Sequence, residues 1–305
     1  MLAEINDFLN NLIWGNILIY LLPLLGVFFT VSSRFVQFRY FFKMFNILRD
    51  TSHKKDGHIS SFQALMLSIA GRVGGGNIAG VAVAITLGGP GAVFWMWIIG
   101  LIGMSTSFFE CSLAQLYKEK DGQDSCVYRG GPAYYATKAL GQKWLGFVIS
   151  ILLMITFGFA FNATQSFIIT TSFESTFNIP TWITAVVLTA IFASAVFGGI
   201  KRITKFSEII VPVMAVGYLL IALVVIGLNF EKIPELISMI VSEAFNPSSA
   251  IGGGIGAVIL QGAKRGMFSN EAGLGSAPNV AAVADVAHPV QQGIVQSFSV
   301  FIDTI

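Results

Sequence analysis

The sequence predicts an all-α membrane protein in which two of the membrane helices are broken. Three observations lead there: an apolar composition, a series of apolar stretches long enough to cross a bilayer, and glycine clusters inside two of them. The 305 residues are 54% hydrophobic and 11% charged, with a mean hydropathy of +0.75, whereas soluble domains carry roughly 25% charged residues. A surface with so little charge is expected to face lipid.

The apolar stretches set the number of predicted spans. Crossing the hydrocarbon takes a helix of roughly 20 apolar residues, because lipid cannot satisfy open backbone N–H and C=O groups. Seven stretches meet or approach that length: 14–32, 62–87, 92–116, 145–171, 181–199, 209–228 and 250–263. An eighth begins near Gly293 and is still apolar at Ile305, so we expect the chain to end inside a helix as a fragment of a longer protein.

The basic residues predict the orientation, because cytoplasmic loops retain Lys and Arg. Alternate loops hold six, five, three and two of them, at 33–60, 117–143, 201–205 and 264–265, while the opposite loops hold only Lys232. The N-terminus is then expected outside. Such dispersed charge argues against a nucleic-acid-binding face. Two further stretches, 35–48 and 230–245, have the pattern of amphipathic interfacial helices.

The first predicted break is the segment Gly71-Arg72-Val73-Gly74-Gly75-Gly76-Asn77. Each interior glycine costs up to about 1 kcal/mol relative to alanine, so this cluster favours local unwinding. Backbone exposed at membrane depth is tolerated where it lines a cavity, in which carbonyls bind a cation and N–H groups a carboxylate. Close helix packing is the alternative use of such glycines. No Lys-Ser or Lys-Thr pair follows, so a nucleotide-binding loop is disfavoured.

The second predicted break covers 251–256 and continues through 261–270, another glycine-rich interruption. Two interrupted segments far apart in a chain are typical of inverted repeats whose broken helices face each other across a ligand. Five spans separate the two, counted from Phe62, and an odd number inverts the topology. The strip 269–271 is expected to be a hinge that faces the cytoplasm.

Several polar residues stand out within apolar stretches. Asn162 and Gln165 lie on one helical face and either bind a ligand or join neighbouring helices. Arg72 and Glu110 are expected to form a structural ion pair or a gate, or Arg72 to face an aqueous vestibule; Asp303 receives no role.

Other functional classes lack a signal in the sequence. His53, His58 and His288 are expected at the surface, and Cys111 and Cys126 as free thiols. No acid–base or nucleophile constellation emerges, so we expect a protein that is not an enzyme.

Three blocks of sequence resemble the alanine or glycine:cation symporter family, also called the sodium:alanine symporters. They are GRVGGGNIAGVA at 71–82, GGPGAVFWMWIIGLIG at 88–103 and GAKRGMFSNEAGLGSAPN at 262–279. The resemblance implies a leucine-transporter-like inverted-repeat bundle. Residues 1–60 would hold a peripheral first helix and a cytoplasmic amphipathic segment, 61–228 the first repeat, and 229–305 the start of an incomplete second repeat. Gly75 departs from the threonine of many members.

The resemblance also implies a function. The expected activity is import of a small neutral amino acid, alanine or glycine, with sodium as the co-transported ion and no other cofactor. The place would be the inner, cytoplasmic membrane of the cell. The alternatives are a proton-coupled carrier that uses Glu110, or a channel.

The expected site residues follow from the same resemblance, joined to the glycine pattern. The substrate would be held by the unwound Gly74, Gly75, Gly76 and Asn77, with Gln261 and Gly262 opposite. Sodium, a hard cation, takes oxygen ligands, for which the backbone carbonyls of Ala70, Arg72 and Val73 are the candidates. The remaining sodium ligands would come from a helix beyond Ile305.

Overall fold

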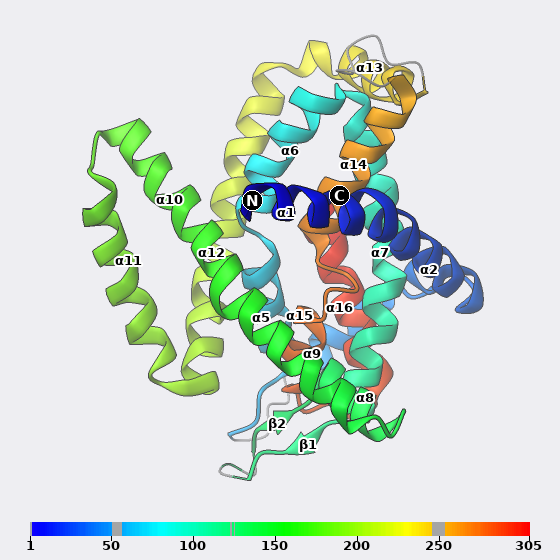
Figure 1. Ribbon diagram of the computed structural model, residues 1–305, viewed down its shortest axis with the longest axis vertical. Coiled ribbons are helices and arrows are strands. Elements are labelled where there is room, and N and C mark those ends of the chain that lie inside the picture. The colour runs from blue at the N-terminus through cyan, green and yellow to red at the C-terminus, as the bar shows by residue number, and fades with distance from the viewer. Residues whose placement is uncertain (1, 51–56, 123, 125, 246–253) are drawn as a thin grey trace.

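The helices follow the predicted apolar stretches closely (Figure 1). The computed structural model describes residues 2–50, 57–122, 124, 126–245 and 254–305. Within these residues the only strands are β1 (Glu119–Lys120) and β2 (Tyr128–Arg129), which form one antiparallel hairpin. The prediction of an all-α chain is therefore confirmed.

Four helical segments of the described chain are long and apolar enough to cross a membrane. They are Glu4–Ser32, built from α1 (Leu2–Asn10), η1 (Asn11–Leu18) and α2 (Ile19–Ser32); α7 (Gly91–Leu116); Lys143–Phe177, built from α9 (Lys143–Ile155), η2 (Thr156–Ala160) and α10 (Phe161–Phe177); and α12 (Gly199–Leu228). The pair α5 (Ser61–Arg72) and α6 (Gly75–Gly88) makes a fifth, bent span, and α11 (Thr181–Val196) is apolar but shorter. These segments are those of a multi-pass membrane protein.

The helix α7 is the centre of the bundle. The elements packed most extensively against it are α2, α13 (Ile233–Phe245), α14 (Gly254–Asn270), α15 (Ser276–Ala282) and α16 (Pro289–Thr304). Small residues permit the close approach: a Cβ on Gly293 of α16 would lie 2.8 Å from the Phe108 carbonyl oxygen of α7. This central packing holds the two broken helices at fixed positions.

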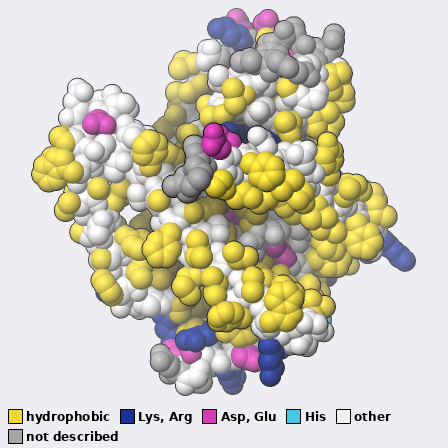
Figure 2. Space-filling model, in the orientation of Figure 1, with side chains coloured by type: hydrophobic (Ala, Val, Ile, Leu, Met, Phe, Trp, Pro, Cys, Tyr) yellow, Lys and Arg dark blue, Asp and Glu magenta, His cyan; other side chains and the backbone are white. Residues whose placement is uncertain are grey.

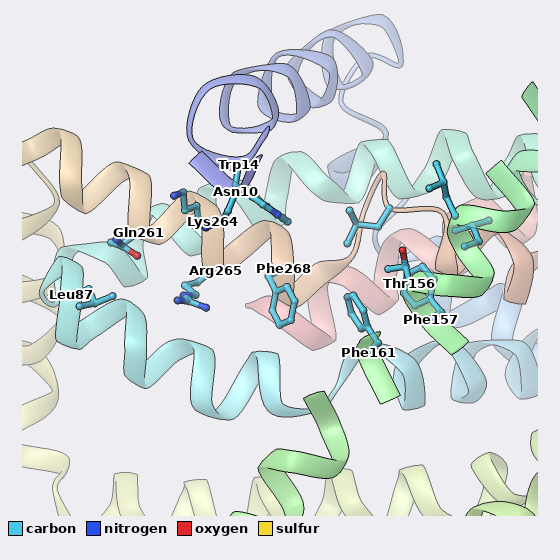
Figure 3. A pocket seen from close by; sticks show the side chains of 13 residues that line it. Asn10, Trp14, Leu87, Thr156, Phe157, Phe161, Gln261, Lys264, Arg265 and Phe268 are labelled. Atoms are coloured by element: carbon cyan, nitrogen blue, oxygen red, sulfur yellow. The ribbon is translucent and has the colours of Figure 1, made fainter. Parts of the chain in front are cut away.

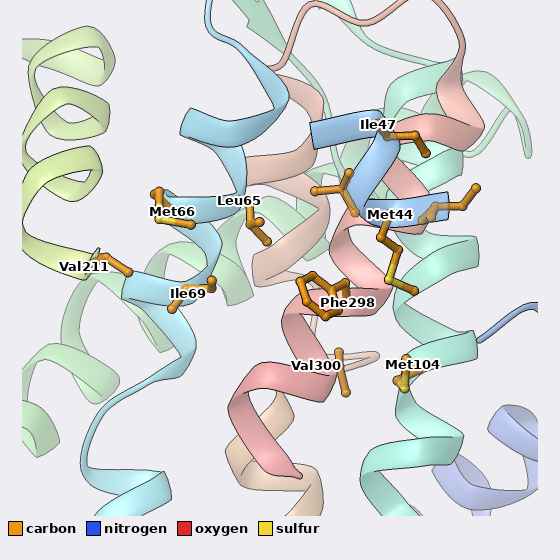
Figure 4. Close-up of a cluster of buried hydrophobic side chains, with 11 residues drawn as sticks. Met44, Ile47, Leu65, Met66, Ile69, Met104, Val211, Phe298 and Val300 are labelled. Carbon is orange, nitrogen blue, oxygen red and sulfur yellow. The ribbon is translucent and has the colours of Figure 1, made fainter. Parts of the chain in front are cut away.

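The largest buried hydrophobic cluster lies between α4 (Lys43–Asp50), α5, α7, α12 and α16 (Figure 4). Its members include Met44, Ile47, Leu65, Met66, Ile69, Met104, Val211, Phe298 and Val300. The predicted amphipathic stretch 35–48 becomes α3 (Val36–Arg39) and α4. Met44 and Ile47 of α4 enter the cluster, whereas Phe42, just before α4, and Phe45 are exposed, so the stretch is amphipathic as predicted, and its place at the membrane interface stays a prediction.

Large apolar side chains cover the outside of the bundle over the middle of the molecule (Figure 2). On α10, α11 and α12, which stand at one side in Figure 1, they include Phe167, Val186 and Leu219, each more than half exposed. Exposing so much apolar area to water would be strongly unfavourable, so lipid is the solvent that suits this surface.

The basic loops gather at one end of the molecule, around the β hairpin and α8 (Pro132–Lys138), where Figure 2 shows Lys, Arg and acidic side chains together. Ion pairs tie this end together, as between Lys201 and Asp124 at 2.5 Å and between Lys138 and Glu119 at 2.8 Å. Elements η3 (Phe230–Lys232) and α13 lie at the other end (Figure 1).

The prediction of a fourth basic loop at Lys264 and Arg265 is wrong, because both residues lie inside α14. The neighbouring glycines are used for packing and not for a turn. A Cβ on Gly262 would lie 2.5 Å from the Ala92 carbonyl oxygen, and one on Gly266 3.1 Å from Ile99. The pair therefore serves the contact with α7, and the helix continues.

Candidate functional site

The first helix break lies where the glycine cluster predicts it but is shorter than predicted. Val73 and Gly74 are extended, with ψ values of 104° and −150°, and α5 and α6 meet at a bend of 42°. Gly75, Gly76 and Asn77 already belong to the first turn of α6, so the prediction that they are unwound is wrong. Two non-helical residues suffice, because the helix restarts as soon as a side chain caps its new N-terminus.

The hydrogen bonds at this break show how the helix is released. The Gly74 N–H donates to Asn77 Oδ1 at 3.0 Å, and the Gly75 N–H donates to Gln165 Oε1 at 3.0 Å. Neither N–H continues the helical pattern to the carbonyls of Ala70 and Gly71. Those carbonyls therefore receive no helical hydrogen bond from Gly74 or Gly75, and sodium binding by Ala70, Arg72 and Val73 stays a prediction.

The second break lies later in the chain than predicted. Helix α14 runs unbroken through Gln261 and Gly262, and the interruption is residues 271–275, before α15. Of the predicted interruption at 251–256, residues 251–253 lie outside the described residues. The backbone turns at Glu271, Gly273 and Gly275, with φ of 50°, 87° and 90°, a region that favours glycine and is uncommon for glutamate.

The two broken helices face each other in opposite order. α6 packs against α14, and α5 packs against α15, so the first half of one helix meets the second half of the other (Figure 1). The breaks consequently lie at a similar level in the bundle, and the N-terminus of α6 and the 271–275 segment approach the same space.

A cavity of about 710 Å³, here the central cavity, lies beside the first break. Residues from both breaks and from α10 line it, among them Gly74, Gly75, Asn162, Gln165, Glu271 and Ser276. The Ser276 hydroxyl donates to Glu271 Oε2 at 2.5 Å, and the Glu271 side chain is otherwise buried. The structure thus brings to one cavity four predicted substrate residues and two residues predicted for sodium, Ala70 and Val73, and adds a carboxylate. Asn162 reaches it from an exposed position, where its amide donates to the Gly158 carbonyl.

Gln261 and Gly262 lie away from the central cavity, so their predicted place at the second break is wrong. Gln261 lines a second cavity of about 680 Å³, here the α14 cavity (Figure 3). Gly262 is buried against α7. The rings of Phe161 and Phe268 stack between the two cavities, with centroids 5.5 Å apart, and Phe161 lines both. Phe268 also covers Gly76, whose added Cβ would lie 3.1 Å from that ring.

Four polar side chains, those of Asn77, Ser269, Asp303 and Thr304, gather at the first turn of α6. The Asn77 amide group donates to Ser269 Oγ at 2.9 Å, to the Asp303 carbonyl oxygen at 3.0 Å and to Asp303 Oδ1. The hydroxyls of Ser269 and Thr304 donate to the other carboxylate oxygen, Asp303 Oδ2, at 3.3 and 2.8 Å. This oxygen-rich cluster has the donor chemistry of a small hard cation. Sequence reasoning assigned no role to Asp303, although an acidic side chain in an apolar stretch is itself a signal of a functional site.

Arg72 and Glu110 do not form the predicted ion pair. Among the described residues, no ion pair within 4 Å includes either side chain. Arg72 donates to Ser107 Oγ at 3.0 Å, to the Gln296 carbonyl oxygen at 3.2 Å and to Ser299 Oγ, which joins α5 to α7 and α16. It is 4% exposed, so the alternative of an aqueous vestibule is wrong as well.

Glu110 instead reaches the second break. Its Oε2 accepts the Gly273 N–H at 3.2 Å, while Oε1 is buried without a partner among the described residues. Ser269, Asn270 and Glu271 are each at most 4% exposed, so the predicted cytoplasm-facing hinge is buried at the break.

Comparison with known proteins identifies the family. The Sodium:alanine symporter family matches residues 1–305. The chain is 50% identical over 295 residues to the amino-acid carrier protein AlsT of Bacillus subtilis, covering 97% of this chain and 62% of that protein. It is 45% identical to the probable sodium/glutamine symporter GlnT of the same organism, covering 100% of this chain and 63% of that protein.

A third relative in Bacillus subtilis is the putative sodium/proton-dependent alanine carrier protein YrbD. It is 45% identical, and the match covers 100% of this chain and 62% of that protein. The chain thus spans just under two thirds of the length of these relatives. With the match extending over every residue, the chain belongs to the sodium:alanine symporter family.

Proposed function

We propose that this chain is part of a sodium-coupled symporter that imports a small neutral amino acid, alanine or glycine, by alternating access. The observation that carries the proposal is the pair of broken helices that meet in opposite order beside the central cavity. Membership of a symporter family and the names of the relatives support it. In such carriers, substrate and ion bind where two discontinuous helices meet.

The proposed architecture is a leucine-transporter-like inverted repeat. Residues 61–228 form the first repeat, which starts with the broken pair α5 and α6, and 229–305 begin the second, which carries α14 and α15. Residues 1–60 stay peripheral to both. The reversed order of the two broken pairs is what inverted copies require.

The amino acid is proposed to bind between the N-terminus of α6 and the second break. Backbone N–H groups of Gly75 and Gly76, together with the positive end of the α6 dipole, suit the substrate carboxylate, beside Gly74, whose own N–H is held by Asn77 Oδ1. For this the Gln165 amide must release the Gly75 N–H. The carboxylate of Glu271, which lines the same cavity, suits the ammonium group. Asn162 and Gln165, which line the central cavity, are also proposed to contact the substrate. Gln261 and Gly262 lie outside this cavity and are not proposed as substrate contacts.

Sodium is proposed to bind at Asp303 and Ser269, whose oxygen atoms converge, with the Asn77 amide N–H group holding the Asp303 carboxylate in place. The carbonyls of Ala70, Arg72 and Val73 remain a second candidate site. Asn77 contributes to both ligands, since its Oδ1 caps α6 and its amide holds Asp303. One ligand thereby favours the arrangement that the other needs, and such a reciprocal free energy is the basis of coupling.

A proton-coupled carrier is the second candidate. The unpartnered, buried Oε1 of Glu110 beside the second break favours it, as does the word "proton" in the name of one relative. A channel has no observation of its own in support.

The proposed location is the inner membrane, with the N-terminus outside. The support is the gathering of the basic hairpin and loops at one end of the bundle.

Uptake by the complete protein in proteoliposomes tests the proposal. Alanine, glycine and glutamine are each offered with an inward sodium gradient, a choline gradient, or a proton gradient without sodium. We expect alanine or glycine uptake with sodium alone, and its loss in Asn77→Ala. The matched control is Asn229→Ala, since Asn229 is exposed and only bonds the Val225 carbonyl of its own helix. Uptake driven by protons without sodium would replace the proposal by the second candidate.

A further inference from the structure

The α14 cavity holds two cations that the proposed transport mechanism does not use. Lys264 and Arg265 lie along it with Gln261 and Phe268 of the same helix, and Leu87 of α6 lies opposite (Figure 3). They precede the end of α14 at Asn270 by six and five residues, or about 9 and 7.5 Å along the helix. Both charges are therefore within membrane depth, on the side of the break that faces α13.

Charges at this depth are costly. A Lys or Arg at the centre of a membrane helix costs about 3 kcal/mol on insertion scales, unless water or an opposite charge compensates it. Among the described residues neither side chain has an ion pair within 4 Å, and Arg265 Nε is buried without a hydrogen-bond partner. The Arg265 side chain lies over Gly80 of α6, where an added Cβ would be 3.9 Å from its Cδ. The described residues that line the cavity thus present positive charge and include no carboxylate to balance it.

The cavity is next to the central cavity, and the rings of Phe157 and Phe161 line both. The stack of Phe161 on Phe268 lies at this boundary and is here called the partition. With the proposed orientation, the α14 cavity lies on the outer side of that partition. A solute that enters from outside meets Lys264 and Arg265 before it reaches the N-terminus of α6.

We propose that Lys264 and Arg265 form an entry subsite that binds the carboxylate of the incoming amino acid. This inference rests on the proposed function. The pair attracts the carboxylate and orients the zwitterion with its carboxylate leading along α14 and its ammonium group away. When the amino acid then passes the rings of Phe161 and Phe268, its carboxylate reaches the N–H groups at the N-terminus of α6, a second positive site. A cleft lined by one sign of charge raises association rates of opposite charges by 10-fold to 1,000-fold.

Thiol reactivity tests the subsite without relying on transport. Gln261→Cys, placed in the complete protein after replacement of its native cysteines, Cys111→Ala and Cys126→Ser among them, reports on the cavity through its reaction rates with anionic sulfonatoethyl and cationic trimethylammonioethyl methanethiosulfonates. We expect the anionic-to-cationic rate ratio to fall at least tenfold when Lys264→Gln and Arg265→Gln are combined. Lys232→Gln, at the same end but outside the cavity, should leave the ratio unchanged. If the double variant has the same anionic-to-cationic rate ratio as the protein with Lys264 and Arg265 intact, the proposal is overturned.

The ligand is tested by protection of the same cysteine. Alanine should slow its modification, and alaninamide, which lacks the carboxylate, should not. The protection should vanish in the double variant. Liposomes of phosphatidylcholine alone and with phosphatidylglycerol distinguish a lipid phosphate: an anionic-to-cationic ratio or protection that changes with phosphatidylglycerol and not with alanine overturns the carboxylate assignment.

Transport kinetics then connect the subsite to function. In the double variant we expect the substrate KM to rise about tenfold with little change in maximal rate, and the wild-type KM to approach the variant value at high ionic strength. If the wild type transports no amino acid in a sodium gradient, the proposed function is wrong. The anionic-to-cationic rate ratio of thiol modification would then still show whether Lys264 and Arg265 form an anion-binding site. A normal KM in a double variant that transports overturns the entry role.

Discussion

A methyl group added at Gly262 distinguishes helix packing from substrate binding at the position where sequence and structure disagree. The new Cβ would lie 2.5 Å from the Ala92 carbonyl oxygen and 2.6 Å from Trp95 Cβ, where ordinary contact begins at 3.4 Å. Gly262→Ala therefore forces α14 and α7 apart by roughly 1 Å in a close-packed region. Such overpacking costs about 1–3 kcal/mol.

The matched control is Gly256→Ala, in the same helix, where no atom of the described residues lies within 4 Å of the new Cβ. Both substitutions gain about 0.8–1 kcal/mol of helix propensity. Their difference isolates the packing cost, so Gly262→Ala should be less stable than Gly256→Ala by about 1–3 kcal/mol.

The assay is unfolding of the complete protein in mixed micelles with a rising fraction of SDS, followed by helix content. The substrate KM of the folded protein should be the same in both variants, because Gly262 does not line the central cavity. Equal stabilities, together with a KM altered only in Gly262→Ala, would refute the packing argument and restore a substrate contact.

Three further predictions concern the ion site, the partition and the basic end. Asp303→Asn should raise the half-saturating sodium concentration at least tenfold, about 1.4 kcal/mol, in a sodium titration of uptake; an unchanged value would exclude Asp303 as a ligand. Phe268→Ala removes the ring that stacks on Phe161 and should increase alanine efflux without sodium, measured from preloaded liposomes. An efflux rate equal to that of the wild type would contradict this prediction. Burial lowers the pKa of Lys118 from 10.5 to about 8, against the opposing effect of Asp285. The unfolded chain then binds more protons between pH 8 and 10.5, so stability rises over that interval, and thermal unfolding of Lys118→Met at pH 8 and 10 should show a smaller rise.

Much of the architecture was predictable because it depends on local properties. The apolar stretches predicted the positions of the long helices, since span length follows from bilayer thickness. Four glycines in six residues predicted the first break, because each glycine destabilises the helix at its own position. The break is nonetheless limited to Val73 and Gly74, since the Asn77 side chain caps α6 at once.

The second break shows where such reasoning fails. Glycine in a membrane helix either loosens the backbone or admits a neighbouring helix, and the choice depends on what lies opposite. Gly262 and Gly266 meet α7 and stay helical, whereas the chain turns at Glu271, Gly273 and Gly275. Nothing in the sequence around these positions distinguishes the two uses without the position of α7.

The hydrogen-bond partners of the buried polar groups could not be predicted from the sequence either. Arg72 and Glu110 are opposite charges in neighbouring spans, yet Arg72 bonds Ser107, Ser299 and a carbonyl, and Glu110 bonds the Gly273 N–H. Asp303 became part of the candidate site only through its contacts with Asn77 and Ser269, 226 and 34 residues away in the chain.

The sequence by itself determined that this chain is a bundle of apolar helices, where most of them run, that one breaks at Gly74, and which family it belongs to. These properties follow from hydrophobicity, backbone freedom and motif, which are all carried by consecutive residues. The tertiary structure alone decided where the second helix breaks, which side chains meet at the breaks, and that Lys264 and Arg265 line a cavity. Directional contacts between distant residues exist only once the helices have packed, and no pattern along the chain encodes them.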